Sequence, residues 1–141
     1  MLSTETKSQQ DLSRDPGMEI MRFALPAMML IHGVTRIAIG GVVPFGGFLG
    51  SRGFPFGVAL AWAITIFELI GSALLCACRF VVITSILFAL ELLMGIVLVH
   101  GPEGWFVVGA GRNGVEYSVL LITGFIALIV SEWRRSKTID S

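Results

Sequence analysis

Four long apolar segments alternate with polar stretches along the 141 residues of the chain. Each approaches the roughly 20 residues that an α-helix needs to cross the hydrocarbon core of a membrane. A transmembrane barrel would need alternating segments of about ten residues, and the sequence shows no such alternation. The pattern therefore predicts an all-α protein with membrane-spanning helices at residues 20–39, 56–78, 80–100 and 117–133.

The connections between these segments predict an antiparallel four-helix bundle. Only Arg79 separates the second segment from the third, which indicates a tight hairpin. Residues 40–57 are rich in glycine and phenylalanine, and we expect an irregular loop packed at the membrane interface. Residues 101–116 form a second long connection, whose Trp105 suits the headgroup layer. Both loops would cover the same end of the bundle.

The composition supports a membrane protein and excludes several other classes. Hydrophobic residues make up 55% of the chain and charged residues 14%, whereas soluble domains carry about 25% charged residues. The formal net charge is zero, which argues against nucleic acid as a partner. Two cysteines are too few for a disulfide-stapled scaffold. An integral membrane protein surrounded by lipid remains.

Basic residues at the ends of the segments predict how the protein is oriented. The polar residues 1–18 and the basic residues 135–141 are expected to form tails outside a membrane domain that covers residues 19–134. Four spans place both termini on one side, and that side collects most of the basic residues: Lys7, Arg14, Arg22, Arg79, Arg134, Arg135 and Lys137. Cytoplasmic loops carry the excess of Lys and Arg. Both termini are therefore predicted to be cytoplasmic, in the cell inner membrane.

Ionisable residues inside the predicted spans are the strongest functional signal. Each costs about 2.5–3.5 kcal/mol at the helix centre, so it needs a partner or a purpose. Most of these groups share the outer half of the bundle by depth. We expect a pocket there in which His32 and Glu68 handle protons, and in which the other polar residues bind a ligand: Arg36, His100, Glu116, Tyr117 and Arg112. The alternative is that these groups only pair with one another, for example Arg36 with Glu68 or Glu116, and orient the helices.

A metal site is not predicted, although His32, His100, Glu68 and Glu116 are acceptable ligand types. The sequence has no close-spaced His pair and no Glu-x-x-His. Its only cysteines, in the Cys76-Ala-Cys78 sequence, are interpreted as small packing residues.

Glu91 is a further ionisable residue within a predicted span. It precedes His100 by nine residues, which places the two side chains on nearly opposite faces of a helix. Unless the helix bends near Gly95, we expect Glu91 to lie outside the pocket, either facing a partner subunit or protonated.

Five short motifs resemble the DoxX family of small four-span membrane proteins of bacteria and archaea. The resemblance extends over about Met21 to Trp133, and its motifs follow in the family's order: Ile31-His32-Gly33-Val34-Thr35-Arg36, Arg52-Gly53-Phe54-Pro55-Phe56, Phe67-Glu68-Leu69-Ile70-Gly71, Val99-His100-Gly101 and Gly114-Val115-Glu116-Tyr117. The sequence departs from the family pattern at Phe56, where a second proline is usual, and at Ser131-Glu132-Trp133, which replaces Ser-Leu-Asp.

The resemblance implies a subunit of a membrane redox complex. Some relatives belong to thiosulfate:quinone oxidoreductase, and others are linked to membrane complexes with a sulfurtransferase and superoxide dismutase. The pocket would then take a quinone headgroup or a small sulfur compound. The sequence carries no haem motif, flavin fingerprint or cluster-binding cysteines, so no intrinsic cofactor is expected, and a partner redox protein or homo-oligomer is implied.

Two other functions stay open at this point. One is a non-enzymatic assembly factor or scaffold, in line with distant eukaryotic relatives that act as membrane chaperones or cargo receptors. The other is a proton-coupled transporter of a small solute, which would require a dimer because four spans are few for alternating access.

Overall fold

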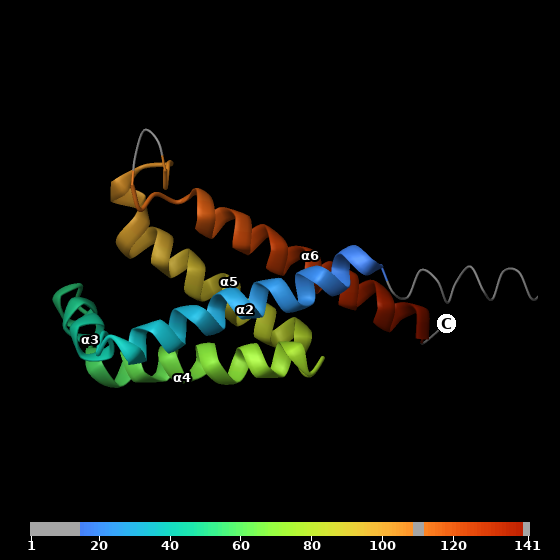
Figure 1. Cartoon of the computed structure of the whole chain (residues 1–141), viewed down its shortest axis with the longest axis horizontal. Helices are drawn as coiled ribbons and strands as arrows, with labels where there is room; N and C mark the ends of the chain where they lie inside the picture. The colour runs from blue at the N-terminus through green and yellow to red at the C-terminus, as the bar shows by residue number, and fades with distance from the viewer. Residues whose placement is uncertain (1–14, 109–111, 140–141) are drawn as a thin grey trace, which may run out of the picture.

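A computed structural model of the chain describes residues 15–108 and 112–139. These residues form helices without any strand, and the α-helices are α2 (Pro16–Ala38), α3 (Val42–Ser51), α4 (Gly57–Cys76), α5 (Val81–Gly95) and α6 (Glu116–Ile139) (Figure 1). A π-helical segment at Ile96–His100 and a 3-10 turn at Gly101–Glu103 continue α5. Most of the predicted N-terminal tail, with Lys7 and Arg14, and the last two residues of the C-terminal tail lie outside the described residues.

Four of the described helices are long and apolar enough to cross a membrane, which confirms the predicted all-helical membrane fold. They cover Pro16–Ala38, Gly57–Cys76, Val81–Glu103 and Glu116–Lys137. Their bounds differ from the predicted spans mainly at the two ends of the chain, where α2 begins earlier and α6 continues into the expected tail.

The early start of α2 has a local cause. The Asp15 carboxylate accepts a hydrogen bond of 2.8 Å from the backbone N–H of Gly17. Pro16 occupies the first turn, where the missing N–H of proline costs nothing. This cap extends the helix into the polar segment that hydropathy alone assigns to a tail.

The expectation of an irregular loop at residues 40–57 is wrong, because most of this connection forms α3. Val42, Gly46 and Leu49 are buried and recur at the i, i+4 and i+7 spacing of one helical face. That face packs against α4. A ten-residue helix is about 15 Å long, half of the hydrocarbon thickness, so α3 caps the bundle without adding a span.

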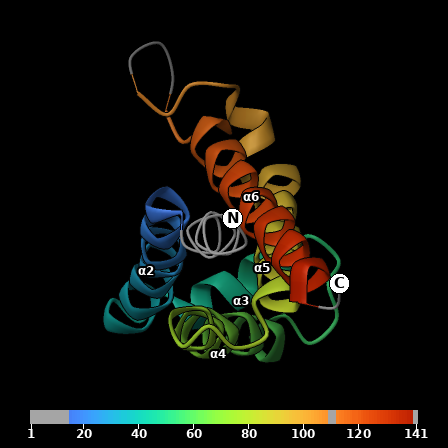
Figure 2. The same ribbon diagram turned by 90° about the vertical axis from the view of Figure 1, so that its right-hand side faces the viewer.

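The spanning helices form two pairs, α2 with α4 and α5 with α6. The pairs approach each other near the C-terminal end of α6 and diverge toward the end where α3 lies (Figure 1). In the view turned by 90°, α2 and α6 lie on opposite sides of the molecule, with α4 below them (Figure 2).

Two separate hydrophobic clusters hold this arrangement. The larger one joins all four spanning helices where the pairs meet, and its aromatic centre is Phe88, whose ring centroid lies 4.7 Å from that of Phe67 and 5.3 Å from that of Phe125. The smaller cluster joins α3 to α4 through Val42, Leu49 and Ala61.

A buried arginine ties three segments together at the end where the pairs meet. Nη2 of Arg22 lies 3.1 Å from Glu132 Oε2 of α6, and Nη1 donates to Cys78 Sγ at 3.2 Å, just beyond α4. The side chain of Arg22 is 6% exposed. Cys78 therefore serves as a hydrogen-bond acceptor, and both it and Cys76 are exposed free thiols.

The contact between α3 and α4 yields a stability prediction. A Cβ atom at Gly46 would lie 2.5 Å from Val58 Cα, whereas one at Gly47 would meet nothing within 4 Å. We expect Gly46→Ala to lower the free energy of unfolding by about 1–3 kcal/mol, because α3 must move away from α4. Gly47→Ala on the same helix should leave it unchanged or raise it by up to about 1 kcal/mol. Thermal unfolding in detergent measures both, and equal effects would contradict this packing.

Candidate functional site

An ion pair between α2 and α4 is the centre of the candidate site. Arg36 Nη1 lies 2.6 Å from Glu68 Oε2, and Nη2 lies 3.0 Å from Oε1, so both carboxylate oxygens are bound in a two-pronged contact. The Glu68 side chain is fully buried, and that of Arg36 is 14% exposed. Nη1 also donates to Thr65 Oγ1 at 3.0 Å, and the guanidinium carbon lies 4.7 Å from the centre of the Phe45 ring.

Gly33 allows the two helices to come close enough for this pair. A Cβ atom at this position would lie 3.0 Å from Glu68 Oε2 and 3.4 Å from the carbonyl oxygen of Thr65. Gly33 and Arg36, three residues apart, share the helix face that meets α4. The spacing of the His32-Gly33-x-x-Arg36 motif thus has a geometric reason, since the glycine makes room for the carboxylate that the arginine binds.

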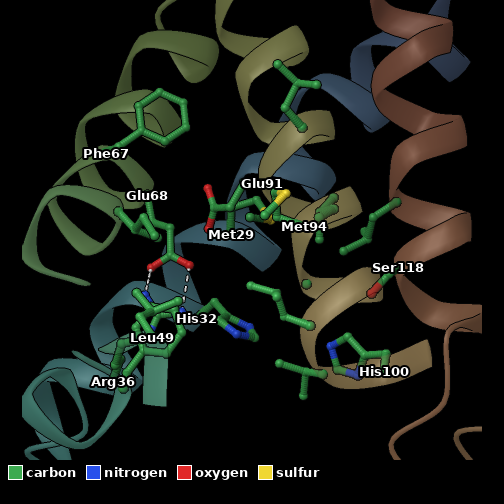
Figure 3. A pocket seen from close by; sticks show the side chains of 18 of the residues that line it. Met29, His32, Arg36, Leu49, Phe67, Glu68, Glu91, Met94, His100 and Ser118 are labelled. Atoms are coloured by element: carbon green, nitrogen blue, oxygen red, sulfur yellow. Dashed lines mark hydrogen bonds and ion pairs between the residues drawn. The ribbon is translucent and has the colours of Figure 1, made fainter. Parts of the chain in front are cut away.

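A cavity of about 860 Å³ opens beside the ion pair, between the two helix pairs. Its walls come from every α-helix of the described chain and are mostly apolar, with contributions from both hydrophobic clusters. Polar side chains gather on these walls, as Figure 3 shows for several of them: His32, Arg36, Glu68, Glu91, His100, Asn113, Tyr117 and Ser118.

Glu91 lines this cavity together with His100, so the expectation that Glu91 lies outside it, made for a helix without a bend near Gly95, does not hold. A regular α-helix would place the two side chains about 180° apart. The helix instead becomes π-helical at Ile96, directly after Gly95. Hydrogen bonds from i to i+5 turn the chain less per residue, so His100 rotates back toward the face of Glu91.

His100 links the end of the third span to the start of the fourth. Its Nδ1 lies 2.8 Å from the carbonyl oxygen of Asn113. Because a carbonyl only accepts, Nδ1 carries the proton in this contact, and Nε2 remains available to a ligand. The ring therefore forms part of the cavity wall and is held in place by the connection before α6.

The other predicted site residues are distributed differently. Tyr117 lines the cavity at the start of α6. Glu116 does not line it, because its Oε1 accepts a hydrogen bond of 3.0 Å from the backbone N–H of Val107 and so orders the connection before α6. Arg112 is exposed and also lies outside the cavity lining. The structure thus brings five of the seven predicted residues together: His32, Arg36, Glu68, His100 and Tyr117.

A second, smaller cavity of about 400 Å³ adjoins the first on the outer side of α2. The two share four lining residues, namely Met28, His32, Arg36 and Tyr117. Three of these, Met28, His32 and Tyr117, are exposed on the surface. The main cavity therefore reaches the side of the bundle between α2 and α6.

Within residues 15–108 and 112–139, no group of three His, Cys, Asp or Glu side chains is arranged to hold a metal ion. Phe45 and Glu91 also line the cavity, and neither was predicted as a member of the site. Glu91 gave a signal, because it is an ionisable residue at the depth of Glu68. Phe45 gave none, because its role depends on the fold of α3.

Comparison with known proteins identifies one family. The sequence model of the DoxX family matches residues 17–101, more than half of the chain. The matched segment includes Gly33, the Arg36–Glu68 pair and His100, and it ends before Glu116 and Tyr117. No curated protein and no solved structure is similar enough to count as a match.

The ion pair yields a second prediction. Arg36→Met leaves the buried Glu68 carboxylate unpaired, and we expect it to lower the free energy of unfolding by about 3 kcal/mol or more. The double variant Arg36→Met/Glu68→Leu should be more stable than the sum of the two single changes indicates, by about 1–3 kcal/mol. Thermal unfolding in detergent measures this coupling.

Arg52→Met is the matched control for this cycle. Arg52 is exposed and lies over the Phe48 ring, with 5.2 Å from its guanidinium carbon to the ring centre. We expect a change within about 1 kcal/mol. Strictly additive effects of the Arg36 and Glu68 substitutions would show that the pair does not couple the two helices.

Proposed function

The chain belongs to the DoxX family, and on this premise we propose that it is an inner-membrane subunit of a redox complex that binds a quinone in the cavity between its helix pairs. The observation that carries this proposal is the character of the cavity, whose walls are mostly apolar and bear a few convergent polar groups. Sites for small organic ligands share this character.

The chemistry of a quinone matches both parts of the cavity. Its ring and isoprenoid chain need apolar surroundings, which Phe45, Phe48 and Phe67 supply along one wall. Its carbonyl oxygens need hydrogen-bond donors, and His32 and Tyr117 carry such groups at the side that adjoins the smaller cavity. In this proposal His32 exchanges protons with the headgroup, and Arg36 contributes the positive end of its ion pair.

The path into the cavity also suits a ligand dissolved in the bilayer. Helix α2 contacts α6 at Gly124, where a Cβ atom would lie 2.7 Å from the Met21 side chain and 2.9 Å from that of Leu25. Two turns further along α2, Met28 and His32 border both cavities. A lateral opening at this level lets an isoprenoid chain extend into lipid while its headgroup stays inside.

Charge favours a neutral quinone over an anionic sulfur compound. The Arg36 guanidinium, the one Arg or Lys group among the described residues that line the cavity, is already matched by Glu68, and Glu91 lies nearby (Figure 3). An anion would enter beside two carboxyl groups without a free cation to meet it. The electrons are assigned to a partner redox protein, since the sequence lacks cofactor-binding motifs.

We propose an antiparallel bundle with both termini in the cytoplasm and the cavity in the outer half of the membrane. Four crossings bring the two ends of the chain to one side, and α3 is too short to add a fifth. Arg22, Arg79, Arg134, Arg135 and Lys137 belong to that side, and an excess of basic residues marks the cytoplasmic side.

Quinone binding is tested by filling the cavity. Leu90 and Leu93 lie on α5 and are 52% and 49% exposed, but only Leu90 lines the cavity. We expect the full-length protein in detergent to bind decylubiquinone, and Leu90→Trp to raise the Kd at least tenfold, about 1.4 kcal/mol. Leu93→Trp should leave the Kd unchanged. Isothermal titration calorimetry measures all three, and absence of binding by the wild-type protein would refute the proposal.

The orientation is tested with the two native thiols. Cys76 and Cys78 are exposed at the end of α4, on the side proposed to be cytoplasmic. A membrane-impermeant maleimide should label them in inside-out vesicles and leave them unlabelled in right-side-out vesicles. A Ser51→Cys variant with both native cysteines replaced by alanine should show the opposite pattern, because α3 caps the outer end. Labelling of both sites from one side would contradict the orientation.

A further inference from the structure

Two carboxyl groups of the cavity, Glu91 on α5 and Glu68 on α4, are bonded to each other. Glu91 points toward Glu68 (Figure 3), and the two share a side-chain hydrogen bond. A hydrogen bond between two carboxyl groups needs one proton, because an ionised carboxylate only accepts. Glu68 accepts from Arg36 through both of its oxygens, which makes it the ionised partner. Glu91 is then the protonated partner, and it donates its one O–H to Glu68.

The charges around the pair support this placement of the proton. Arg36 is matched by Glu68, and the described part of the cavity wall offers no second Arg or Lys to balance an ionised Glu91. Burial of an unpaired charge costs far more than burial of a neutral polar group. With the O–H of Glu91 used on Glu68, its other carboxyl oxygen can only accept a hydrogen bond.

His100 has the same arrangement at the outer end of the same cavity. Its Nδ1 carries the hydrogen that is donated to the carbonyl oxygen of Asn113, at 2.8 Å. In the neutral ring, Nε2 then has a lone pair and accepts. Glu91 and His100 therefore both direct a hydrogen at the protein and leave an acceptor for a ligand.

These acceptors distinguish the two redox forms of a quinone. The oxidised form carries carbonyl oxygens, which only accept, whereas the reduced hydroquinone carries two O–H donors. His32 and Tyr117 each hold a donor and an acceptor, so they suit either form. A quinone carbonyl beside Glu91 would face another acceptor and leave both unsatisfied, which is costly in a buried site.

From this distribution of hydrogens we propose that the cavity binds the hydroquinone form of its ligand more tightly than the quinone form, with one hydroquinone hydroxyl donating to the second carboxyl oxygen of Glu91. The inference rests on the proposed quinone site and deepens it by naming the redox form that the site favours. It assigns the contact to a residue outside the five sequence motifs. Both forms are neutral, so the charge argument for a neutral ligand applies to each of them.

The preference has a consequence for the bound ligand. Tighter binding of the reduced form raises the midpoint potential of the bound couple, and a fivefold preference corresponds to about 20 mV for two electrons. The cavity therefore stabilises the ligand in the form that it has after accepting electrons. This suits a site that receives its electrons from a partner redox protein.

The test compares decylubiquinone with decylubiquinol on the full-length protein in detergent, by isothermal titration calorimetry without oxygen. We expect the Kd of the quinone to exceed that of the hydroquinone about fivefold, the effect of one neutral hydrogen bond. A ratio within twofold of unity, or a preference for the quinone, would overturn the inference.

Substitutions of Glu91 test which residue produces the preference. Glu91→Leu removes the acceptor at similar volume, and the Kd ratio should fall to within twofold of unity. Glu91→Gln keeps an N–H for Glu68 and a carbonyl oxygen for the ligand, so the preference should remain. Leu93→Ala is the matched control, because Leu93 lies on α5 without lining the cavity, and it should leave the ratio unchanged.

Infrared difference spectroscopy supplies a readout that a purely structural role would not change. Decylubiquinol should move the C=O stretching band of a protonated carboxyl group to lower wavenumber in the wild-type protein, because that oxygen gains a hydrogen bond. Decylubiquinone should leave the band in place, and the band should be absent in Glu91→Gln. Thermal unfolding shows whether each variant is folded. If Glu91→Leu fails to fold, the wild-type band decides, and no shift with decylubiquinol overturns the contact.

The outcomes separate this inference from the proposed function. A protein that binds both forms equally keeps its quinone site and loses the preference. A preference that survives in folded Glu91→Leu overturns the role of Glu91. Loss of the preference in both Glu91→Leu and Glu91→Gln would show that an ionised carboxylate accepts the bond, which overturns the neutral Glu91. A wild-type protein that binds neither form refutes the proposed function and, with it, this inference.

Discussion

The buried contact between Arg36 and Glu68 is the constraint on which the site depends, because an unpaired charge at this depth of a membrane is too costly to keep. Matching the two charges fixes the level at which α2 and α4 face each other. Gly33 makes that approach possible, since even a Cβ atom there would press against the carboxylate. Once Glu68 is bound to Arg36, the pair is electrically neutral, and Glu91 lies beside it on the cavity wall with its Oε2 atom unpartnered among the described residues.

The cavity arises from how unevenly the helices are packed. Phe67, Phe88 and Phe125 fill the end where the helix pairs meet, and Gly124 lets α2 come close to α6 there. At the other end, α3 packs on α4 and leaves the space between the pairs open. The polar groups thus face a volume that protein side chains do not occupy, bounded by a hydrophobic cluster on either side.

Much of the site was predictable because each ionisable residue within an apolar segment can be recognised from the sequence without knowing its neighbours in space. That argument selected His32, Arg36, Glu68 and His100, and it named Glu68 as one of two possible partners of Arg36. The same argument failed for side chains whose location depends on contacts with another segment. Glu116 has the right residue type and depth, but it binds the backbone of Val107. Glu91 was expected outside the pocket unless the helix bends near Gly95, and the π-helical segment that begins at Ile96 meets this condition.

The sequence by itself determined the membrane class, the four apolar helices and the identity of most of the groups that must be paired, because hydropathy and charge are local properties of each segment. Tertiary structure decided which carboxylate meets Arg36, that residues 42–51 form a helix, and that the π-helical turn at Ile96–His100 brings Glu91 and His100 to one cavity. These features depend on contacts between helices and on the hydrogen bonding of the backbone. The periodicity of hydrophobic residues does not predict these features, because it shows only which residues of a segment avoid water.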